Sequence, residues 1–300
     1  MKEQYPLVSV VVPSYNQGKF IKDTIESILN QDYPNIELIV MDGASTDNTV
    51  EILKSYGDKF YWQSKKDKGQ SDAINQGWKI SKGSILAWLN SDDTYLPGAL
   101  SKVVNYFKNN PHIHVVYGEG YHTFEDGTIM ERYPTESFNA ERLKETCFIC
   151  QPTVFMRKEA LLKVDFVNEK LNYCMDYDLW LRLAKDFQFG YIGDYLATSR
   201  LYADNKTLGQ KERVHAEIIE MLYKNLSLVP APWIYGYAHA LLETKYDRSN
   251  SSENFKFITN LIFISAKTFC KYNKKLPLGE LRRMASWFSH GLLKRWGLKS

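Results

Sequence analysis

The chain has 300 residues, 44% of them hydrophobic and 24% charged, with a net charge of +3 at pH 7. This composition excludes a disordered or low-complexity protein, and the length allows one large domain with appendages or two domains. Eight Lys or Arg residues and one Glu fall between residues 271 and 300, which gives this segment a charge of +7 and leaves −4 for the rest of the chain. The imbalance indicates either an anionic partner at the C-terminal end or a solvated basic helix.

Strand-like and helix-like segments alternate from residue 8 onward. A β-branched run at 8–13 closes with Pro13, and residues 20–30 follow with the apolar spacing of a helix. The pattern recurs as a strand at 37–41 and a helix at 49–56, then a strand at 60–62 and a helix at 72–80, and a last strand at 84–89. Apolar strands that alternate with helices predict an α/β fold, Rossmann-like, with a mostly parallel sheet covered by helices on both faces.

The predicted strands end in polar residues. These ends read Pro13-Ser14-Tyr15-Asn16, residues 42–47, residues 65–70 and Asn90-Ser91-Asp92-Asp93. Ligands of parallel sheets bind outside the carboxyl ends of the strands, so we expect a site there. Asp92 and Asp93 stand side by side, which is typical either of a solvated turn or of a metal site.

The second half of the chain changes pattern twice. Extended residues at 115–121 and a turn at 125–127 predict a hairpin with antiparallel strands, and a helix follows at 176–184 with Asp176 and Asp178 in its first turn. Beyond residue 206 only helices are predicted, without an apolar run of about 20 residues that could span a membrane. These predicted helices cover residues 213–226, 232–246, 254–272 and 278–296. The opening residues lack a signal-peptide pattern, so we expect a cytoplasmic protein.

Several common catalytic and nucleotide-binding motifs are missing from the sequence. It contains neither a P-loop nor a strand-linked G-x-G-x-x-G, and its six histidines form no H-x-x-x-H pair. Cys147 and Cys150 have the spacing of half a zinc site but lack a second pair, so reduced, partly buried thiols are expected. We therefore expect carboxylates to carry any chemistry.

The sequence contains the runs VSVVVPSYNQGKFIKDTIESILNQDYPNIELIVMDGASTDNT, KDKGQSDAINQGW and GSILAWLNSDD. Together these runs resemble the inverting family 2 glycosyltransferases of the GT-A fold, and the resemblance extends from residue 7 to about residue 202. It implies a GT-A catalytic domain at residues 1–205 and a helical C-terminal extension at 206–300. It also implies a metal-dependent enzyme that moves a sugar from a nucleotide-diphosphate sugar to an acceptor hydroxyl with inversion, in bacterial surface-polysaccharide or glycolipid synthesis.

The resemblance assigns the two central chemical roles to carboxylates. Asp92 corresponds to the ligand of a divalent cation, Mn2+ or Mg2+, that neutralises the diphosphate leaving group. Asn90 stands where the family's Asp-x-Asp pattern has its first Asp, which weakens a contact to ribose or metal. Asp176 occupies the position of the general base, although Glu-Asp is commoner there than Met175-Asp176.

The donor and acceptor contacts are also implied by the resemblance. Asp42 corresponds to the carboxylate that accepts a hydrogen bond from uracil, which favours UDP, although thymine presents the same N–H. Tyr202 replaces a His of many relatives, so Arg200, Lys206 or bound water is expected to neutralise phosphate instead. The remaining substrate-binding assignments are Pro13, Tyr15, Asp67, Lys68, Asp72, Asn90, Ser91 and Gln151.

Two further questions stay open at the level of sequence. The helix at 278–296 has an apolar face with basic flanks, which fits either an anionic membrane surface or packing on the catalytic domain. Two other functions also remain. One is that of a non-catalytic nucleotide-sugar-binding subunit. The other is that of a nucleotidyltransferase, although the sequence lacks the Gly-rich loop that such an enzyme is expected to have. The expected partners are a nucleotide-sugar donor and a glycan or lipid-linked glycan acceptor, not nucleic acid. The expected location is the cytoplasm, peripheral to the inner face of the cell membrane.

Overall fold

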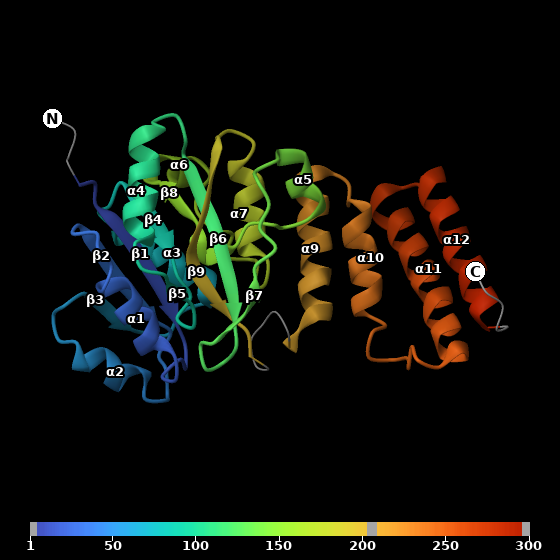
Figure 1. Cartoon of the computed structure of the whole chain (residues 1–300), viewed down its shortest axis with the longest axis horizontal. Helices are drawn as coiled ribbons and strands as arrows, with labels where there is room; N and C mark the ends of the chain where they lie inside the picture. Colours follow the sequence, from blue (N-terminus) through green and yellow to red (C-terminus); the bar gives the residue numbers. More distant parts are fainter. Residues whose placement is uncertain (1–4, 203–208, 296–300) are drawn as a thin grey trace. The chain divides into compact units, whose positions relative to one another are not determined.

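The computed structural model describes residues 5–202 and 209–295 (Figure 1), with the side chain of Lys294 left out. The chain divides into two compact units. The first comprises Met1–Leu143 and Cys147–Asn205, and the second Lys144–Thr146 and Lys206–Ser300. All the strands among the described residues belong to the first unit, and the long helices after residue 210 belong to the second.

The first four strands of the first unit form a parallel sheet in the order β3-β2-β1-β4. Helices join consecutive strands, as a parallel arrangement requires. Every residue of β1 is buried, because helices cover both faces of the sheet. The bounds are β1 (Val8–Ser14), α1 (Ile21–Leu29), β2 (Ile36–Asp42), α2 (Thr49–Ser55), β3 (Tyr61–Ser64), α3 (Gln70–Ile80) and β4 (Ile85–Trp88). The predicted mixed α/β architecture is confirmed.

The same sheet continues beyond β4 in the order β8-β6-β9-β5. Strand β8 is antiparallel to β4 and β6, and β7 pairs with β6 as the predicted hairpin, whereas β9 runs parallel to β6. The bounds are β5 (Thr94–Tyr95), α4 (Ala99–Asn109), β6 (Val115–Thr123), β7 (Ile129–Arg132), α5 (Ala140–Glu145), η1 (Gln151–Thr153), β8 (Phe155–Arg157), α6 (Lys158–Lys163), α7 (Met175–Leu183) and β9 (Phe189–Arg200).

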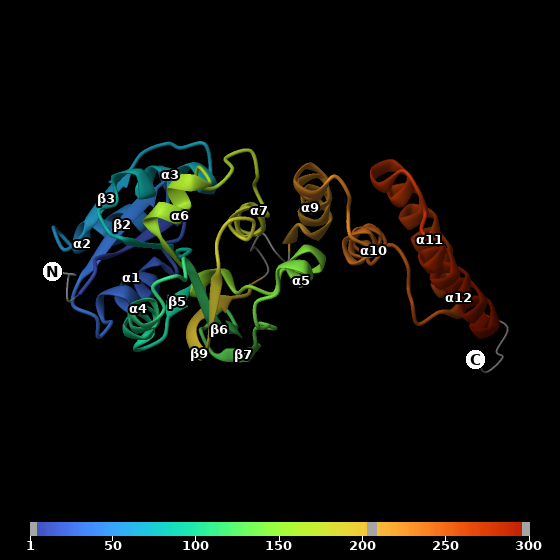
Figure 2. The same ribbon diagram turned by 90° about the horizontal axis from the view of Figure 1, so that it is seen from above.

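The two faces of β1 pack against different helices. Figure 2 shows α3 on one side of the strands, with α1 and α4 on the other. Alternate residues of a strand point to opposite faces. Val8, Val10 and Val12 lie in one core cluster with apolar side chains of α1 and α4. On the opposite face, a Cβ added at Gly77 of α3 would lie 2.5 Å from a methyl carbon of Val11, so α3 approaches the sheet closely.

A chain of tryptophan rings fixes α3 and α7 on β4. Trp88, the last residue of β4, has its ring centroid 5.3 Å from that of Trp78 in α3 and 5.5 Å from that of Trp180 in α7. All three side chains are buried, and the indole N–H of Trp78 donates to the backbone oxygen of Ala87 at 3.2 Å. This packing sets the start of α7, and with it Asp176, relative to the end of β4.

The second unit consists of helices that pack through their apolar faces. Helix α10 ends six residues before the predicted position, and α11 starts three residues earlier than predicted, because Asn250 caps it by accepting the N–H groups of Ser252 and Glu253. The predicted end of the last helix, Trp296, lies outside the described residues. The bounds are α9 (Lys211–Leu226), α10 (Ala231–Ala240), α11 (Ser251–Asn273) and α12 (Leu278–Arg295). Within the described ranges, none of the helices has the length and apolar character needed to cross a membrane.

The close approach of α3 to β1 gives a stability prediction. Gly77→Ala places a methyl group against Val11, so the free energy of unfolding should fall by about 1 to 3 kcal/mol despite the helical preference of Ala. Urea denaturation measures this change. The control is Gly193→Ala in β9, where an added Cβ meets no atom within 4 Å, and it should change stability by less than about 0.5 kcal/mol. Equal stability of the two variants would contradict the packing described for α3.

Candidate active site

The polar residues predicted from the strand ends lie along one edge of the parallel sheet. The register pairs Ser14 at the end of β1 with Asp42 at the end of β2, and Asp42 with Ser64 at the end of β3. Strand β4 lies on the other side of β1 and leads into residues 90–93. The fold therefore brings together segments from four separate parts of the sequence, as expected for a site at the carboxyl ends of parallel strands.

Asp42 is held by neighbouring serines. Its carboxylate accepts hydrogen bonds from the backbone N–H and the hydroxyl of Ser45 and from the hydroxyl of Ser64, and the residue is only 2% exposed. A carboxylate offers about four lone-pair positions, so about one remains for a ligand. The structure thus gives Asp42 a role in shaping the ends of β2 and β3, while its predicted contact with the base stays a prediction.

Asp67 reaches the end of β2 from the segment that follows β3. A Cβ added at Gly43 would lie 2.9 Å from Oδ2 of Asp67, so the absence of a side chain at Gly43 makes room for this carboxylate. Oδ1 of Asp67 accepts the N–H of Gly69 at 2.8 Å, and the residue is half-buried. Among the described residues, Oδ2 accepts no hydrogen bond and is open to a donor.

Asp72 binds groups of its own helix and of the residues just before it, while its predicted contact with substrate stays a prediction. Its Oδ2 accepts the backbone N–H of Lys68 at 3.0 Å and the side-chain amide of Gln76 at 2.8 Å. Partial burial alone raises the pKa of Asp72, but these hydrogen bonds outweigh it and lower the pKa. Asp72 therefore closes the first turn of α3, whereas the side chain of Lys68 is exposed beside it.

The loops after β1 and β2 are bound to each other. Asn16, with a φ of 53°, accepts the N–H of Thr46 at 2.8 Å and donates its own N–H to the hydroxyl of Ser45 at 2.7 Å. Pro13 is buried next to this loop, and Tyr15 is 61% exposed. We did not predict the role of Asn16 from sequence, although Asn is one of the few residues that tolerate a positive φ.

The paired carboxylates after β4 have different surroundings. Asp93 is 3% exposed; its Oδ2 accepts from the amide of Asn90 at 3.1 Å and its Oδ1 from the backbone N–H of Arg200 at 3.0 Å. Burial, followed by the nearby charge of Asp92, raises the pKa of Asp93 well above its ordinary value. Asp92 is half-buried and reaches the surface. Of the two adjacent carboxylates, one is therefore buried and the other lies at the surface.

Asn90 and Gln151 belong to an internal amide network. Oδ1 of Asn90 accepts from Gln70 at 2.8 Å, and its amide also donates to Oε1 of Gln151 at 3.0 Å. The amide of Gln151 in turn donates to the backbone oxygen of Trp88 at 3.0 Å. Asn90 and Gln151 thus make contacts within the chain, and Ser91 is 3% exposed, while the predicted substrate contacts of all three stay predictions.

The guanidinium of Arg200, at the end of β9, makes three contacts within the chain, and its predicted contact with phosphate stays a prediction. Nε donates to the backbone oxygen of Asp92 at 3.0 Å, Nη1 to that of Glu125 at 2.6 Å, and Nη2 to the carboxylate of Asp23 at 3.2 Å. The residue is 7% exposed and lies over the ring of Phe20. Its observed role is to hold the turn that contains Asp92. Lys206, the alternative cation, lies outside the described residues.

Tyr202 contacts the predicted metal ligand directly. Its hydroxyl donates to Oδ2 of Asp92 at 2.9 Å and accepts from the amide of Gln17 at 3.5 Å, and its ring centroid is 5.0 Å from that of Phe20. Burial, together with the charge of Asp92, raises the pKa of Tyr202 above its ordinary value, so the phenol stays protonated and donates. The Tyr that replaces the expected His thus orients the carboxylate.

The oxygen ligands at this edge of the sheet suit a hard divalent cation that is held partly by the protein and partly by the phosphate oxygens of a substrate. Within residues 5–202 and 209–295, no group of three His, Cys, Asp or Glu side chains could hold a metal ion by itself. The protein instead offers the single carboxylate of Asp92 at a half-buried position. Mg2+ and Mn2+ accept such sites, because water and phosphate oxygens complete their coordination, whereas zinc sites need three or four protein ligands.

Asp176 lies in the first turn of α7, near the segment that also approaches Asp93. Burial raises the pKa of the Cys147 thiol, with a further contribution from the charge of Asp176. Burial likewise raises the pKa of the Cys150 thiol, and the charge of Asp93 adds to it. Both cysteines are free thiols. Cys147 is therefore near Asp176, and Cys150 is near Asp93.

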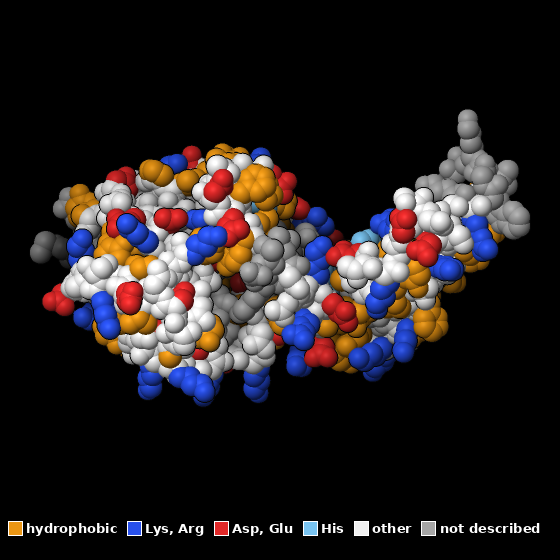
Figure 3. All heavy atoms as spheres, turned by 90° about the horizontal axis from the view of Figure 1, so that it is seen from below, with side chains coloured by type: hydrophobic (Ala, Val, Ile, Leu, Met, Phe, Trp, Pro, Cys, Tyr) orange, Lys and Arg blue, Asp and Glu red, His pale blue; other side chains and the backbone are white. Residues whose placement is uncertain are grey.

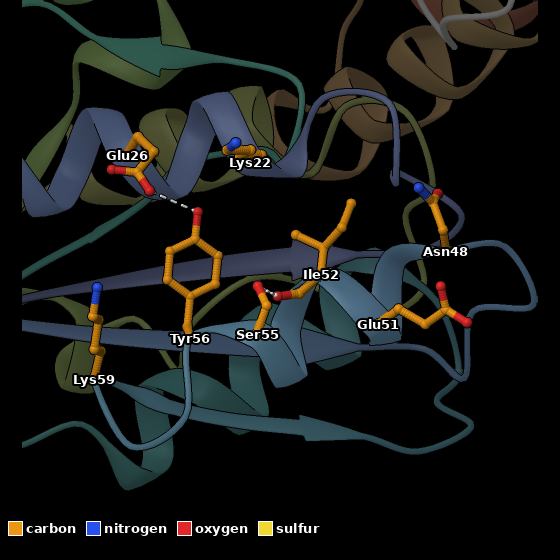
Figure 4. A pocket seen from close by; sticks show the side chains of 8 residues that line it. All are labelled: Lys22, Glu26, Asn48, Glu51, Ile52, Ser55, Tyr56 and Lys59. Atoms are coloured by element: carbon orange, nitrogen blue, oxygen red, sulfur yellow. Dashed lines mark hydrogen bonds between the residues drawn. The ribbon is translucent and has the colours of Figure 1, made fainter.

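A surface hollow elsewhere in the first unit contains none of the predicted site residues. Figure 4 shows its lining from α1, α2 and the loops beside them, with the hydroxyl of Tyr56 donating to Glu26 at 2.8 Å. Acidic and basic side chains alternate around it, so it offers no net charge for a diphosphate. The lining residues are Lys22, Glu26, Asn48, Glu51, Ile52, Ser55, Tyr56 and Lys59. The chemistry at the strand ends makes that edge the better candidate.

Known proteins resemble this chain in sequence. The family described as Glycosyl transferase family 2 matches residues 9–165. An uncharacterized glycosyltransferase of Rickettsia prowazekii is 29% identical over 248 residues, which are 79% of this chain and 78% of that protein. One of Methanocaldococcus jannaschii is 31% identical, over 65% of this chain and 71% of its own length. Hyaluronan synthase of Pasteurella multocida is 29% identical over 71% of this chain, but over only 23% of the synthase.

Solved structures share the fold. TarS of S. aureus in complex with UDP-GlcNAc superimposes with a TM-score of 0.63 and 19% identity, over 97% of this chain and 92% of the TarS chain. A mannosyltransferase of Pyrobaculum calidifontis in complex with GDP-Man and Mn2+ gives a TM-score of 0.58 and 16% identity, over 97% and 81%. The first unit has the GT-A fold that the sequence predicted. With its sequence match over more than half of its length, the chain belongs to glycosyl transferase family 2.

Proposed function

We propose that the protein transfers a sugar from a UDP-sugar to an acceptor hydroxyl with inversion at the anomeric carbon. The observation that carries this proposal is the position of Asp92, a half-buried carboxylate just after β4 that Tyr202 and Arg200 hold from β9 and the segment after it. Asp176, in the first turn of α7, provides a second carboxylate. Membership of family 2, and solved relatives of the same fold that hold UDP-GlcNAc or GDP-Man, support the assignment.

Asp92 is proposed to hold a divalent cation, Mn2+ or Mg2+. When bound there, the cation supplies positive charge for the diphosphate that leaves the sugar. The residues of the chain keep Asp92 in place, because Tyr202 contacts its carboxylate and Arg200 its backbone oxygen. Asn90 supports Asp92 indirectly. Its amide donates a hydrogen bond to the buried carboxylate of Asp93, and this bond stabilises the turn that contains Asp92.

Asp176 is proposed to accept the proton of the acceptor hydroxyl as the new bond forms. The first turn of α7 favours negative charge through the backbone N–H groups at the helix start. The neighbouring thiols of Cys147 and Cys150 have raised pKa values and stay protonated, so they do not compete as bases near neutral pH. A base that acts on the acceptor is the requirement for direct displacement with inversion.

The nucleotide is proposed to lie over the ends of β1, β2 and β3. Oδ2 of Asp67 is open above Gly43 and suits the imide N–H of uracil better than Asp42, whose oxygens already bind Ser45 and Ser64. The exposed ring of Tyr15 offers a surface for the base, and the exposed Lys68 a positive charge for phosphate. Asp42 keeps about one lone-pair position, so its predicted contact with the base is proposed beside that of Asp67.

The acceptor is proposed to be a glycan or lipid-linked glycan of a bacterial surface polysaccharide or glycolipid, reached from the cytoplasmic face of the membrane. Two similar proteins of Pasteurella multocida, named hyaluronan synthase and chondroitin synthase, support a polysaccharide setting. The competing function is a non-catalytic nucleotide-sugar-binding subunit, which Asn90 in place of an acid and Tyr202 in place of a His favour. Hydrolysis of UDP-sugars by the isolated protein distinguishes the enzyme from the binder. Family membership leaves the nucleotidyltransferase alternative without support.

The metal role of Asp92 predicts a change in nucleotide binding. Asp92→Asn keeps the size of the side chain but removes its charge, so UDP affinity in the presence of Mn2+ should fall by about 100-fold or more, while affinity without Mn2+ changes little. Isothermal titration calorimetry measures both affinities. The exposed Asp58→Asn serves as a matched control and should bind as the wild type does. An unchanged Mn2+ dependence in Asp92→Asn would remove Asp92 from this role.

The amide at residue 90 predicts an effect on stability. Asn90→Asp adds a negative charge beside the buried Asp93 and removes the donor that Asp93 and Gln151 share. The free energy of unfolding at pH 7.5 should fall by about 2 to 4 kcal/mol. The loss should shrink toward pH 5, because protonation relieves the repulsion between the two carboxylates. Urea denaturation at both pH values tests this, with the exposed Asn109→Asp as control. A loss that stays constant with pH contradicts the charge argument.

The base role of Asp176 predicts a kinetic effect without a binding effect. Asp176→Asn should lower the rate of sugar transfer by about 100-fold or more while UDP affinity is retained. The neighbouring Asp178 is an unsuitable control, because it is 4% exposed and paired with Arg182 at 2.8 Å. Asp186→Asn, at a partly exposed carboxylate just after α7, is the better match. Similar transfer rates for Asp176→Asn and Asp186→Asn would exclude Asp176 as the base.

A further inference from the structure

Helix α12 packs one apolar face inside the second unit. Met284 is 2% exposed, and the ring centroid of Trp287 lies 4.8 Å from that of Tyr235 in α10. A Cβ added at Gly291 would meet Ile258 of α11 at 2.9 Å, so the two helices approach closely there. These contacts account for one side of α12 and are those of an ordinary helix in a globular unit.

A second apolar face of α12 is exposed. It is a line of four large side chains, here called the outer stripe, which are 38% to 63% exposed. At about 100° per residue, their spacing places them on one side of the helix, next to the packed face. The outer stripe consists of Leu278, Leu281, Phe288 and Leu292. Phe288 also contacts Phe255 of α11, with 5.5 Å between the ring centroids, but the stripe as a whole stays exposed. An exposed strip of large apolar side chains is a feature of interaction surfaces.

Positive charge surrounds the outer stripe. At about 100° per residue, Arg282 lies on one side of the outer stripe and Arg295 on the other side. Both arginines are exposed. The segment 271–300 carries +7 as a whole. Figure 3 shows Lys and Arg side chains beside hydrophobic ones on the surface of the second unit. An apolar strip between arginines is the composition of a helix that lies in the headgroup region of an anionic membrane.

We propose that the outer stripe docks the protein on an anionic phospholipid surface, with α12 lying in the plane of the headgroups. A second copy of the chain fits less well, because a two-fold contact through the stripe would bring the arginines of both copies together. Anionic headgroups instead complement these charges. Docking of this kind needs no spanning segment, and no helix of the described part is suited to span.

The test uses the full chain and vesicle co-sedimentation at low salt. Vesicles of phosphatidylcholine with phosphatidylglycerol should pellet the wild type, and vesicles of phosphatidylcholine alone should not. Leu278→Gln combined with Leu281→Gln removes the two most exposed leucines of the stripe and should lower partitioning by about tenfold or more. Arg282→Gln should lower it by about fivefold and weaken its salt dependence.

A matched control carries two equally exposed leucines outside the stripe. Leu162→Gln combined with Leu228→Gln changes side chains that are 57% and 49% exposed and should pellet like the wild type. Failure of the wild type to pellet with anionic vesicles, equal pelleting with neutral ones, or wild-type pelleting of the Leu278/Leu281 variant would each overturn the proposal. A dimer in light scattering that this variant splits would assign the stripe to a second copy instead.

The experiment is independent of the proposed catalytic site. The outer stripe contains none of the residues proposed to bind donor, cation or acceptor, so its variants should hydrolyse UDP-sugars as the wild type does. An inactive protein that binds anionic vesicles would refute sugar transfer but support docking. An active protein that does not bind anionic vesicles would support sugar transfer but refute docking.

Discussion

The burial of one carboxylate organises the candidate site. Asp93 cannot be exposed to water where it lies, so it needs donors from the chain, and the structure supplies them from Asn90 and from the backbone of Arg200, 107 residues away. These hydrogen bonds connect the end of β4 to the end of β9. Asp92, next in the sequence, is thereby turned outward, and Tyr202 just beyond β9 meets it. The position of the half-buried carboxylate of Asp92 thus depends on the hydrogen bonds that satisfy the buried carboxylate of Asp93.

The fold assigns different tasks to the two halves of the sheet. The parallel strands β1 to β4 deliver short polar loops to one edge, where Asp67 and Tyr15 surround the proposed nucleotide position. The later elements contribute rigidity: Trp180 of α7 stacks on Trp88, and Gln151 binds the backbone of that same residue. Because both attachments converge on Trp88, the proposed base and the proposed metal ligand share one anchor at the end of β4.

The sequence alone predicted the parts of the structure that depend on local pattern. Strands β1, β2 and β4 are continuous apolar runs between helices, so their existence and direction follow from periodicity. Strand β8 has three residues and exists only through pairing with β4 and β6, which no local pattern shows. The site divides in the same way. The carboxylates at strand ends were predictable, but an amide such as Asn90 serves a ligand or a neighbour equally well, and the partners of Arg200 come from three distant segments.

Gly43 has no side chain, and the carboxylate of Asp67 occupies the space beside it. This arrangement constrains how the proposed nucleotide site can change during evolution. An acidic side chain introduced at residue 43 would collide with the carboxylate that already fills the space, since even a Cβ would lie 2.9 Å from Oδ2 of Asp67. Loss of Asp67 alone would leave the space without an acceptor. Transfer of the negative group from the segment after β3 to the segment after β2 therefore requires two substitutions, each unfavourable without the other. Residues 43 and 67 are expected to covary, and the order in which they change limits the accessible mutational paths.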